Sequence, residues 1–290
     1  MVLSKTRRFA ALLLIALAIF APWAAKADGN KPRRIVSLNL CADELVLRLA
    51  DRERIAAVTW LSRDPNNTNV VDLAADVPIN HGLAEEIVPL DPDLVIAGTH
   101  TTRTAVALLK RAGFPLIELG VPRTLDEVRV QIRTVANAVG EPERGERLIA
   151  DMDIRLAALP RVAPGKRLRA LVLNPNGFTA GADSLVDKII TAAGLENLAP
   201  RLGVGNYGHV PLETVVTSRP DVLILNDRRD GPPSLATVLL QHPALAGLAD
   251  HAVLAVLPAR LWNCGGPGVI EAIERLSRIA SRSTSARAGE

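Results

Sequence analysis

The chain has 290 residues, 48% of them hydrophobic and 22% charged, and its formal net charge is +3. Residues 1–27 hold four basic residues and no acids, so the remaining 263 residues carry a net charge of −1. A nearly neutral chain argues against a nucleic-acid binder, which normally presents a basic face. This length is enough for one large domain or for two lobes that each have a core.

The N-terminus has the three parts of a secretory signal peptide. Lys5, Arg7 and Arg8 precede the apolar run FAALLLIALAIFAPW, and the small residues AKA end at Ala27. The apolar run is short for a membrane span, and no second run follows it. No cysteine stands at the cleavage point, which argues against a lipid anchor. We expect cleavage after residue 27 and a soluble periplasmic protein.

Short β-rich runs then alternate with helical patterns, which indicates an α/β fold with mostly parallel sheets. We expect helices over 101–113 and 124–140, and Thr124 with Glu127 predicts a capping box at the start of the second. Strands are expected over residues 34–38, 54–59, 93–97, 115–119, 169–173, 221–225 and 252–256.

A longer amphipathic helix is expected over 141–159, because Pro142 lies in its first turn and apolar residues follow at helical spacing. The predicted organisation is therefore an N-terminal lobe (28–140), a linking helix (141–160) and a C-terminal lobe (161–280). The small, polar and charged tail 281–290 is expected to be disordered.

An internal repeat supports two similar lobes. The segments EEIVPLDPDLVIAG (85–98) and ETVVTSRPDVLILN (213–226) align without gaps at an offset of 128 residues. Each reads as a short helix, a Pro-Asp corner that ends it, and a buried strand. The alternative is chance recurrence of a common α/β device.

These segments, together with RIVSLNLCADELVLRLA and GFTAGADSLVDKIITAAGLENLA, resemble the periplasmic substrate-binding proteins of ABC importers for cobalamin, ferric siderophores and haem. The likeness runs from about Arg33 to Ile279. It implies two α/β lobes joined by one long helix with a ligand cleft between them. It also implies that Glu85 and Glu213 dock on arginines of the membrane permease, with Glu86 as the alternative to Glu85.

Ligands of parallel sheets bind at the carboxyl ends of the strands, and the loops there hold most of the few aromatic residues. Flat rings in such loops favour a flat, partly apolar ligand, although any one ring can instead plug the base of a loop. Arginines in the same loops are candidates for contacts with polar ligand groups. The predicted ligand-binding residues are Trp60, Arg63, Phe178, Tyr207, Arg260 and Trp262.

The sequence gives little support for dinucleotide binding, catalysis or a metal-ion site. GVGNYG (203–208) matches a dinucleotide-binding pattern but lacks its strand and helix context. No catalytic motif is recognisable, so we expect a binding protein and not an enzyme. A direct metal-ion site from His81, His100 and His209 is a minority alternative, as is haem ligation by Tyr207 or His209.

Cys41 and Cys264 are the only cysteines of the chain, and each follows a predicted strand. In an oxidising compartment an even count favours a disulfide, which here would tie the two lobes together. The alternative is a pair of free thiolates that contact a ligand or soft metal.

The sequence thus predicts a monomeric solute-binding component of an ABC transporter. We expect it to capture a metal chelate, foremost cobalamin or a related corrinoid, and to deliver it to the permease and ATPase complex. Ferric siderophore or haem binding is the alternative. No cofactor is expected, because the chelate is the transported ligand.

Overall fold

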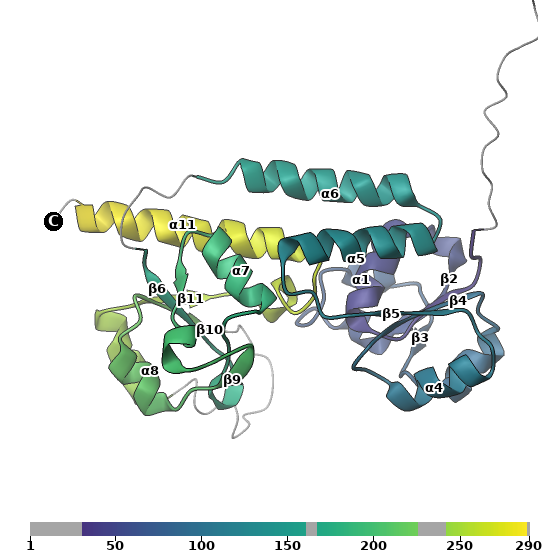
Figure 1. Ribbon diagram of the computed structural model, residues 1–290, viewed down its shortest axis with the longest axis horizontal. Helices are drawn as coiled ribbons and strands as arrows, with labels where there is room; N and C mark the ends of the chain where they lie inside the picture. Colours follow the sequence, from purple (N-terminus) through teal and green to yellow (C-terminus); the bar gives the residue numbers. More distant parts are fainter. Residues whose placement is uncertain (1–30, 161–166, 226–241, 289–290) are drawn as a thin grey trace, which may run out of the picture. The chain divides into compact units, whose positions relative to one another are not determined.

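The computed structural model describes residues 31–160, 167–225 and 242–288. The expected signal peptide and its cleavage point lie outside these residues. Two parallel sheets and the helices around them account for most of the described chain (Figure 1). This confirms the predicted α/β class.

The N-terminal lobe contains a five-stranded parallel sheet in the order β3-β2-β1-β4-β5. Its central strands are fully buried and apolar because helices cover both faces of a sheet of this kind. The strands are β1 (Ile35–Ser37), β2 (Ile55–Thr59), β3 (Ile79–Asn80), β4 (Leu94–Gly98) and β5 (Leu116–Leu119). The helices of this lobe are α1 (Leu40–Leu49), α2 (Val71–Ala74), α3 (Ala84–Ile87), α4 (Arg103–Arg111) and α5 (Leu125–Ala138).

The C-terminal lobe contains a four-stranded parallel sheet in the order β11-β10-β6-β8 and a separate antiparallel pair, β7 with β9. Its strands are β6 (Arg169–Leu173), β7 (Phe178–Ala180), β8 (Glu196–Asn197), β9 (Tyr207–His209), β10 (Val222–Leu225) and β11 (Val253–Val256). Its helices are α7 (Leu185–Ala192), α8 (Leu212–Ser218), α10 (Pro243–Ala246) and α11 (Gly268–Ala288).

The sequence repeat is also a structural repeat. In the N-terminal lobe the Asp93 carboxylate accepts hydrogen bonds from the backbone N–H groups of Arg33 and Arg34, each at 2.7 Å, at the start of β1. In the C-terminal lobe Asp221 accepts one from the N–H of Arg169, at 2.9 Å, at the start of β6. Each aspartate therefore fastens its own strand to the neighbouring parallel strand.

The residue before each Pro-Asp corner also has the same backbone conformation in the two lobes. Asp91 and Arg219 both have φ of +44°, a left-handed conformation that ends the preceding helical turn. The arginine at the start of the neighbouring strand donates to the carbonyl of that residue in both lobes. Chance recurrence does not account for such matched contacts.

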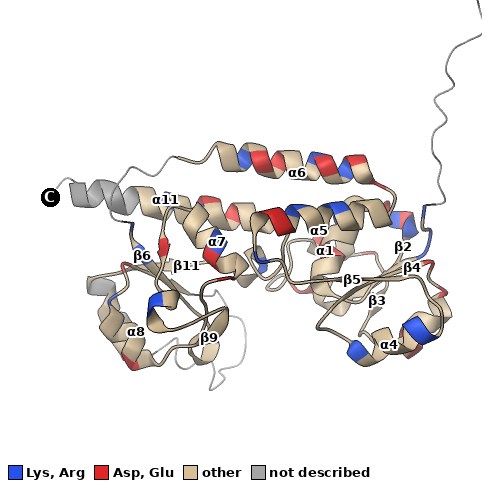
Figure 2. Ribbon diagram, viewed as in Figure 1, with Lys and Arg blue, Asp and Glu red and all other residues tan. Residues whose placement is uncertain are grey.

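Helix α6 (Pro142–Ala157) follows the N-terminal lobe and contacts both α5 and α11 (Figure 1). Acidic and basic residues are interspersed along the helix (Figure 2). Arg155 pairs with Glu274 of α11 at 2.9 Å, and Arg133 of α5 pairs with Glu146 of α6 at 2.6 Å. The helix is thus attached to elements of both lobes.

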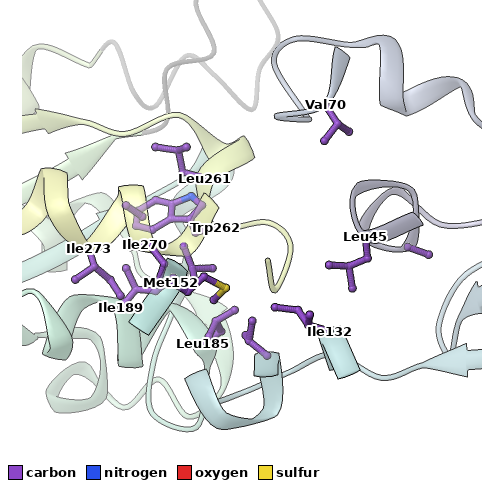
Figure 3. Packing of buried hydrophobic residues seen from close by; sticks show 14 of the residues in the cluster. Leu45, Val70, Ile132, Met152, Leu185, Ile189, Leu261, Trp262, Ile270 and Ile273 are labelled. Carbon is purple, nitrogen blue, oxygen red and sulfur yellow. The ribbon is translucent and has the colours of Figure 1, made fainter. Parts of the chain in front are cut away.

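One buried cluster continues from lobe to lobe. Leu45 and Ile132 of the N-terminal lobe, Met152 of α6, and Ile189 and Ile273 of the C-terminal lobe all belong to it (Figure 3). A shared core of this kind resists separation of the elements that build it, since opening would expose apolar surface.

Helix α11 continues to Ala288, and so includes most of the tail that composition predicts to be disordered. Small and charged residues such as Ala and Arg are compatible with the end of a helix whose earlier turns are already packed. Composition alone does not show that a helix precedes the tail.

Candidate functional site

An aromatic cluster stands on the antiparallel pair of the C-terminal lobe. The rings of Phe178 and Tyr207 are stacked, with centroids 5.8 Å apart and planes 10° apart. The ring of His209 meets Phe178 edge-on at 5.5 Å. Phe178 and Tyr207 are 37% and 46% exposed, so the pair offers free aromatic surface. Partial burial raises the pKa of the Tyr207 phenol.

The geometry of this cluster follows from the pairing of β7 with β9. Phe178 lies opposite His209, and Ala180 lies opposite Tyr207. Gly181 follows β7, and a Cβ there would collide with the carbonyl oxygens of Val204 and Gly205. The glycine-rich segment 203–208 therefore packs closely on the end of β7.

In the N-terminal lobe Trp60 directly follows β2 and is 48% exposed, so its ring is available to a ligand. Arg63 lies three residues later, but its guanidinium donates to the carbonyl oxygens of Ala75 and Val77, the latter at 2.8 Å. These bonds hold Arg63 Nη2 to its own lobe, and a contact of Arg63 with a ligand stays a prediction.

Arg260 binds another segment of the protein, and Trp262 is buried. Arg260 Nη1 donates to Asn69 Oδ1, and Asn69 Nδ2 donates to the Arg260 carbonyl oxygen, both at 2.6 Å. Trp262 is 6% exposed and packs beside Leu261 and Ile270 in the shared core (Figure 3). A buried ring offers no face to a ligand, so Trp262 is a core residue in this structure.

Cys41 and Cys264 form a disulfide, with Cα atoms 5.1 Å apart. The bond joins α1 of the N-terminal lobe to the turn before α11, and the free-thiolate alternative is therefore wrong for this structure. Gly265, the next residue, packs so closely that a Cβ there would collide with Pro122 of the N-terminal lobe. The segment 260–265 is thus fastened to the N-terminal lobe by covalent, polar and packing contacts.

Two buried acids beside this bond support the same region. Asp43 accepts hydrogen bonds from the backbone N–H and the hydroxyl of Thr59, the residue before Trp60. Burial raises the pKa of Asp43 to about 7, although hydrogen bonds from Ser37 and Thr59 oppose the rise. Asp43 therefore fixes the end of β2.

Glu44 binds Asn69, the residue that is hydrogen-bonded to Arg260. Its Oε1 accepts from the Asn69 N–H at 3.1 Å and from Asn69 Nδ2 at 3.2 Å. Burial raises the pKa of Glu44. Sequence reasoning missed both acids and Asn69, although two adjacent acids in the apolar helix LCADELVLRL are a signal that could have identified them.

Glu85 and Glu213 occupy equivalent places in the first turns of α3 and α8, and both side chains are exposed. Glu86 accepts hydrogen bonds from the backbone N–H groups of His81 and Leu83 and pairs with the His81 ring. Within the described residues no hydrogen bond or ion pair engages the Glu85 or Glu213 carboxylate. Of the two neighbouring acids, Glu85 is therefore the one available to a partner.

Among the described residues, no three His, Cys, Asp or Glu side chains come together as metal ligands. His81 instead pairs with Glu86, His209 contacts Phe178, and His100 lines a small pocket after β4. The same part of the chain holds no helix long and apolar enough to cross a membrane.

The protein has two lobes, each built on a parallel sheet, and exposed aromatic rings on both lobes. This combination is typical of ligand-binding proteins of the two-lobed α/β class. Residues 35–253 match the periplasmic binding protein family, and the chain belongs to that family. Solute binding is accordingly its general role.

Similar proteins include some that are named for cobalamin or vitamin B12 and some that are named for heme. The cobalamin-binding protein of Halobacterium salinarum is 24% identical over 263 residues, which cover 88% of this chain and 71% of that protein. The vitamin B12-binding protein of Pectobacterium carotovorum is 26% identical, over 71% of this chain and 75% of its own. Among solved structures, the periplasmic heme-binding protein RhuT of Roseiflexus is 28% identical, with a TM-score of 0.68, over 84% of this chain and 96% of its own.

Proposed function

We propose that the protein captures a metal chelate with a broad, flat ring system in the periplasm, cobalamin or a related corrinoid, and delivers it to an ABC permease. The exposed stack of Phe178 on Tyr207 carries this proposal, because aromatic faces bind a flat, partly apolar ring over a large area. The relatives named for cobalamin support it.

Trp60 supplies a third exposed ring, on the other lobe. It stands on a buried support, because Asp43 holds the adjacent Thr59. These bonds restrain the backbone that precedes the Trp60 ring.

Isothermal titration of the purified protein with cyanocobalamin, haemin and ferrichrome tests the proposal. Cyanocobalamin should bind, and Phe178→Ala and Tyr207→Ala should each weaken it by about tenfold through loss of apolar contact area. Ile154→Ala, which removes an exposed apolar side chain from α6, should leave affinity unchanged. Absence of binding to all three chelates would disprove the role in chelate capture.

Haem is a second candidate because Tyr207 and His209 stand two residues apart on β9, both exposed, and both side chains can ligate iron. Tyr207→Phe separates the candidates, since it keeps the ring and removes the oxygen. Corrinoid stacking should survive this change. Loss of haemin binding with a change in its absorption spectrum would instead favour haem.

Docking on the permease is proposed to use Glu85 and Glu213. Two exposed carboxylates on separate lobes give a two-point electrostatic fit that fixes orientation more than it adds affinity. A Glu85→Ala/Glu213→Ala variant should bind ligand normally but fail to restore uptake in a strain that lacks the protein. Glu143→Ala, at an exposed acid of α6, is the matched control. Normal uptake by the double variant would rule out this docking role.

A further inference from the structure

A small pocket lies at the carboxyl ends of β4 and β5, beside the disulfide. Its walls include the turns 98–101 and 119–122, Cys41 of α1, and Asn263 with Gly265 from the segment before α11. We call it the Cys41 pocket. Cys264, the other half of the disulfide, is not among the residues that line it.

The two cysteines of the disulfide differ in their access to solvent. Cys264 is 5% exposed, whereas Cys41 is partly exposed. The Cys41 Sγ atom lies 3.7 Å from the carbonyl oxygen of Asn263, another residue of the pocket wall. The Cys41 sulfur is therefore the one that a molecule in the pocket can approach.

The size of the pocket limits what can enter it. Its volume is about 100 Å³. A single buried water needs only about 10–15 Å³ of such space, whereas the pocket for a drug-sized ligand measures about 300–1,000 Å³. The Cys41 pocket therefore has room for a short molecule of a few heavy atoms, such as free cysteine.

A small thiol in this pocket would meet a disulfide with one accessible sulfur. In thiol–disulfide exchange a thiolate attacks one sulfur while the other sulfur leaves, and access decides which of the two is attacked. Attack on Cys41 expels the Cys264 sulfur. Since the pocket reaches Cys41 and burial shields Cys264, this direction of exchange is the accessible one.

We propose that Cys41 is a site of reversible S-thiolation by a low-molecular-weight thiol. The sulfur of the incoming thiolate bonds to Cys41 Sγ, and the bond between Cys41 and Cys264 breaks. The Cys264 sulfur takes up a proton from solvent, which replaces the proton that the incoming thiol lost. One disulfide is exchanged for another, so the step involves no net oxidation or reduction.

The exchange would release the covalent link between the lobes. The segment 260–265 would then be held by the hydrogen bonds between Asn69 and Arg260 and by the packing of Gly265. The Cα atoms of the two cysteines are 5.1 Å apart, within the range of about 4.4–6.8 Å that a disulfide needs. The Cys264 thiol can therefore attack the mixed disulfide and restore the link once the small thiol is removed.

The first test incubates the purified protein with millimolar free cysteine at neutral pH and stops the exchange with acid. Peptic digestion at low pH and mass spectrometry then locate the adduct. The adduct on Cys41 should exceed that on Cys264 by at least about tenfold, because access favours Cys41. It should disappear after gel filtration removes the cysteine. An adduct mainly on Cys264, equal adducts on both cysteines, or no adduct would each overturn the inference.

The second test asks whether the thiol enters through the pocket. Gly120 lies in the pocket wall, and a Cβ there would meet no atom within 4 Å, so Gly120→Phe adds a ring to the wall without a clash at Cβ. This variant should form the Cys41 adduct about tenfold more slowly. Gly247→Phe is the matched control, because a Cβ there also meets nothing within 4 Å and Gly247 does not line the pocket.

Thermal melting followed by circular dichroism checks that both variants are folded. An unchanged rate in folded Gly120→Phe, or an equal decrease in both variants, would overturn the assignment of the pocket as the entry path. Neither experiment uses the chelate, so a failure of the proposed function leaves this inference intact.

Discussion

Removal of the disulfide is the perturbation with the largest expected effect on stability. Cys41 and Cys264 are 223 residues apart in sequence, so the bond closes most of the chain into one loop. In the chain-entropy description, a loop of this length restricts the unfolded state by an amount equivalent to about 5 kcal/mol at 25 °C. The Cys41→Ser/Cys264→Ser variant should lose up to about that free energy of unfolding.

The folded state should change little, because Asn69 and Arg260 still clasp each other and Gly265 still packs on the N-terminal lobe. Urea unfolding of the chain from residue 28 onward, followed by far-ultraviolet circular dichroism, measures the loss. The denaturant dependence should also steepen, since the unfolded variant exposes more surface than the cross-linked chain.

Reduced wild-type protein should match the double serine variant, and a reducing agent should leave the variant unchanged. A loss below about 1 kcal/mol with an unchanged denaturant dependence would refute the reasoning that the bond acts on the unfolded chain.

Three further predictions concern the support of the site and the lobes. The pKa of Asp43 is about 7 in the folded protein against 3.8 for an unperturbed aspartate, so its contribution to stability is present below about pH 4 and is lost as the pH rises through 7. Asp43→Asn should therefore flatten the decline in urea stability between pH 5 and pH 8, by up to about 3 kcal/mol, and equal slopes would contradict this. Asp93→Ala and Asp221→Ala should each lower the free energy of unfolding by about 1–3 kcal/mol, because each leaves strand-end N–H groups without their acceptor. Urea titrations measure the loss, and a loss for only one of the two variants would count against the equivalence of the two aspartates. Gly181→Ala should lower the melting temperature, since the added Cβ collides with the Val204 carbonyl oxygen, and an unchanged melting temperature would show that the segment 203–208 yields freely.

The longer strands of both main sheets were predictable because a parallel strand covered on both faces is typically a continuous apolar run. RALVL predicts β6 at 169–173, where the structure has it. The strands β3 and β8 contain two residues each and β7 and β9 three each, too few to show a period. They depend on pairing with distant segments and were not predictable.

The residues of the candidate site also differ in whether the sequence could predict their exposure. Trp60, Phe178 and Tyr207 are exposed rings, as their places in predicted loops suggest. Trp262 stands in a similar loop but packs into the core that α11 completes, and Arg260 is held by Asn69 from 191 residues away. Residue type and loop position do not distinguish a free side chain from one that a distant segment engages.

By itself, the sequence determined the α/β class, the two similar lobes, the family resemblance and the pair of cysteines, because these depend on local periodicity, a repeat and residue count. Tertiary structure alone decided which of the predicted site residues are exposed and which bind or pack against other parts of the protein. It also decided that Glu86 is engaged while Glu85 is exposed. Those properties arise from contacts between segments far apart in the chain, which no local pattern encodes.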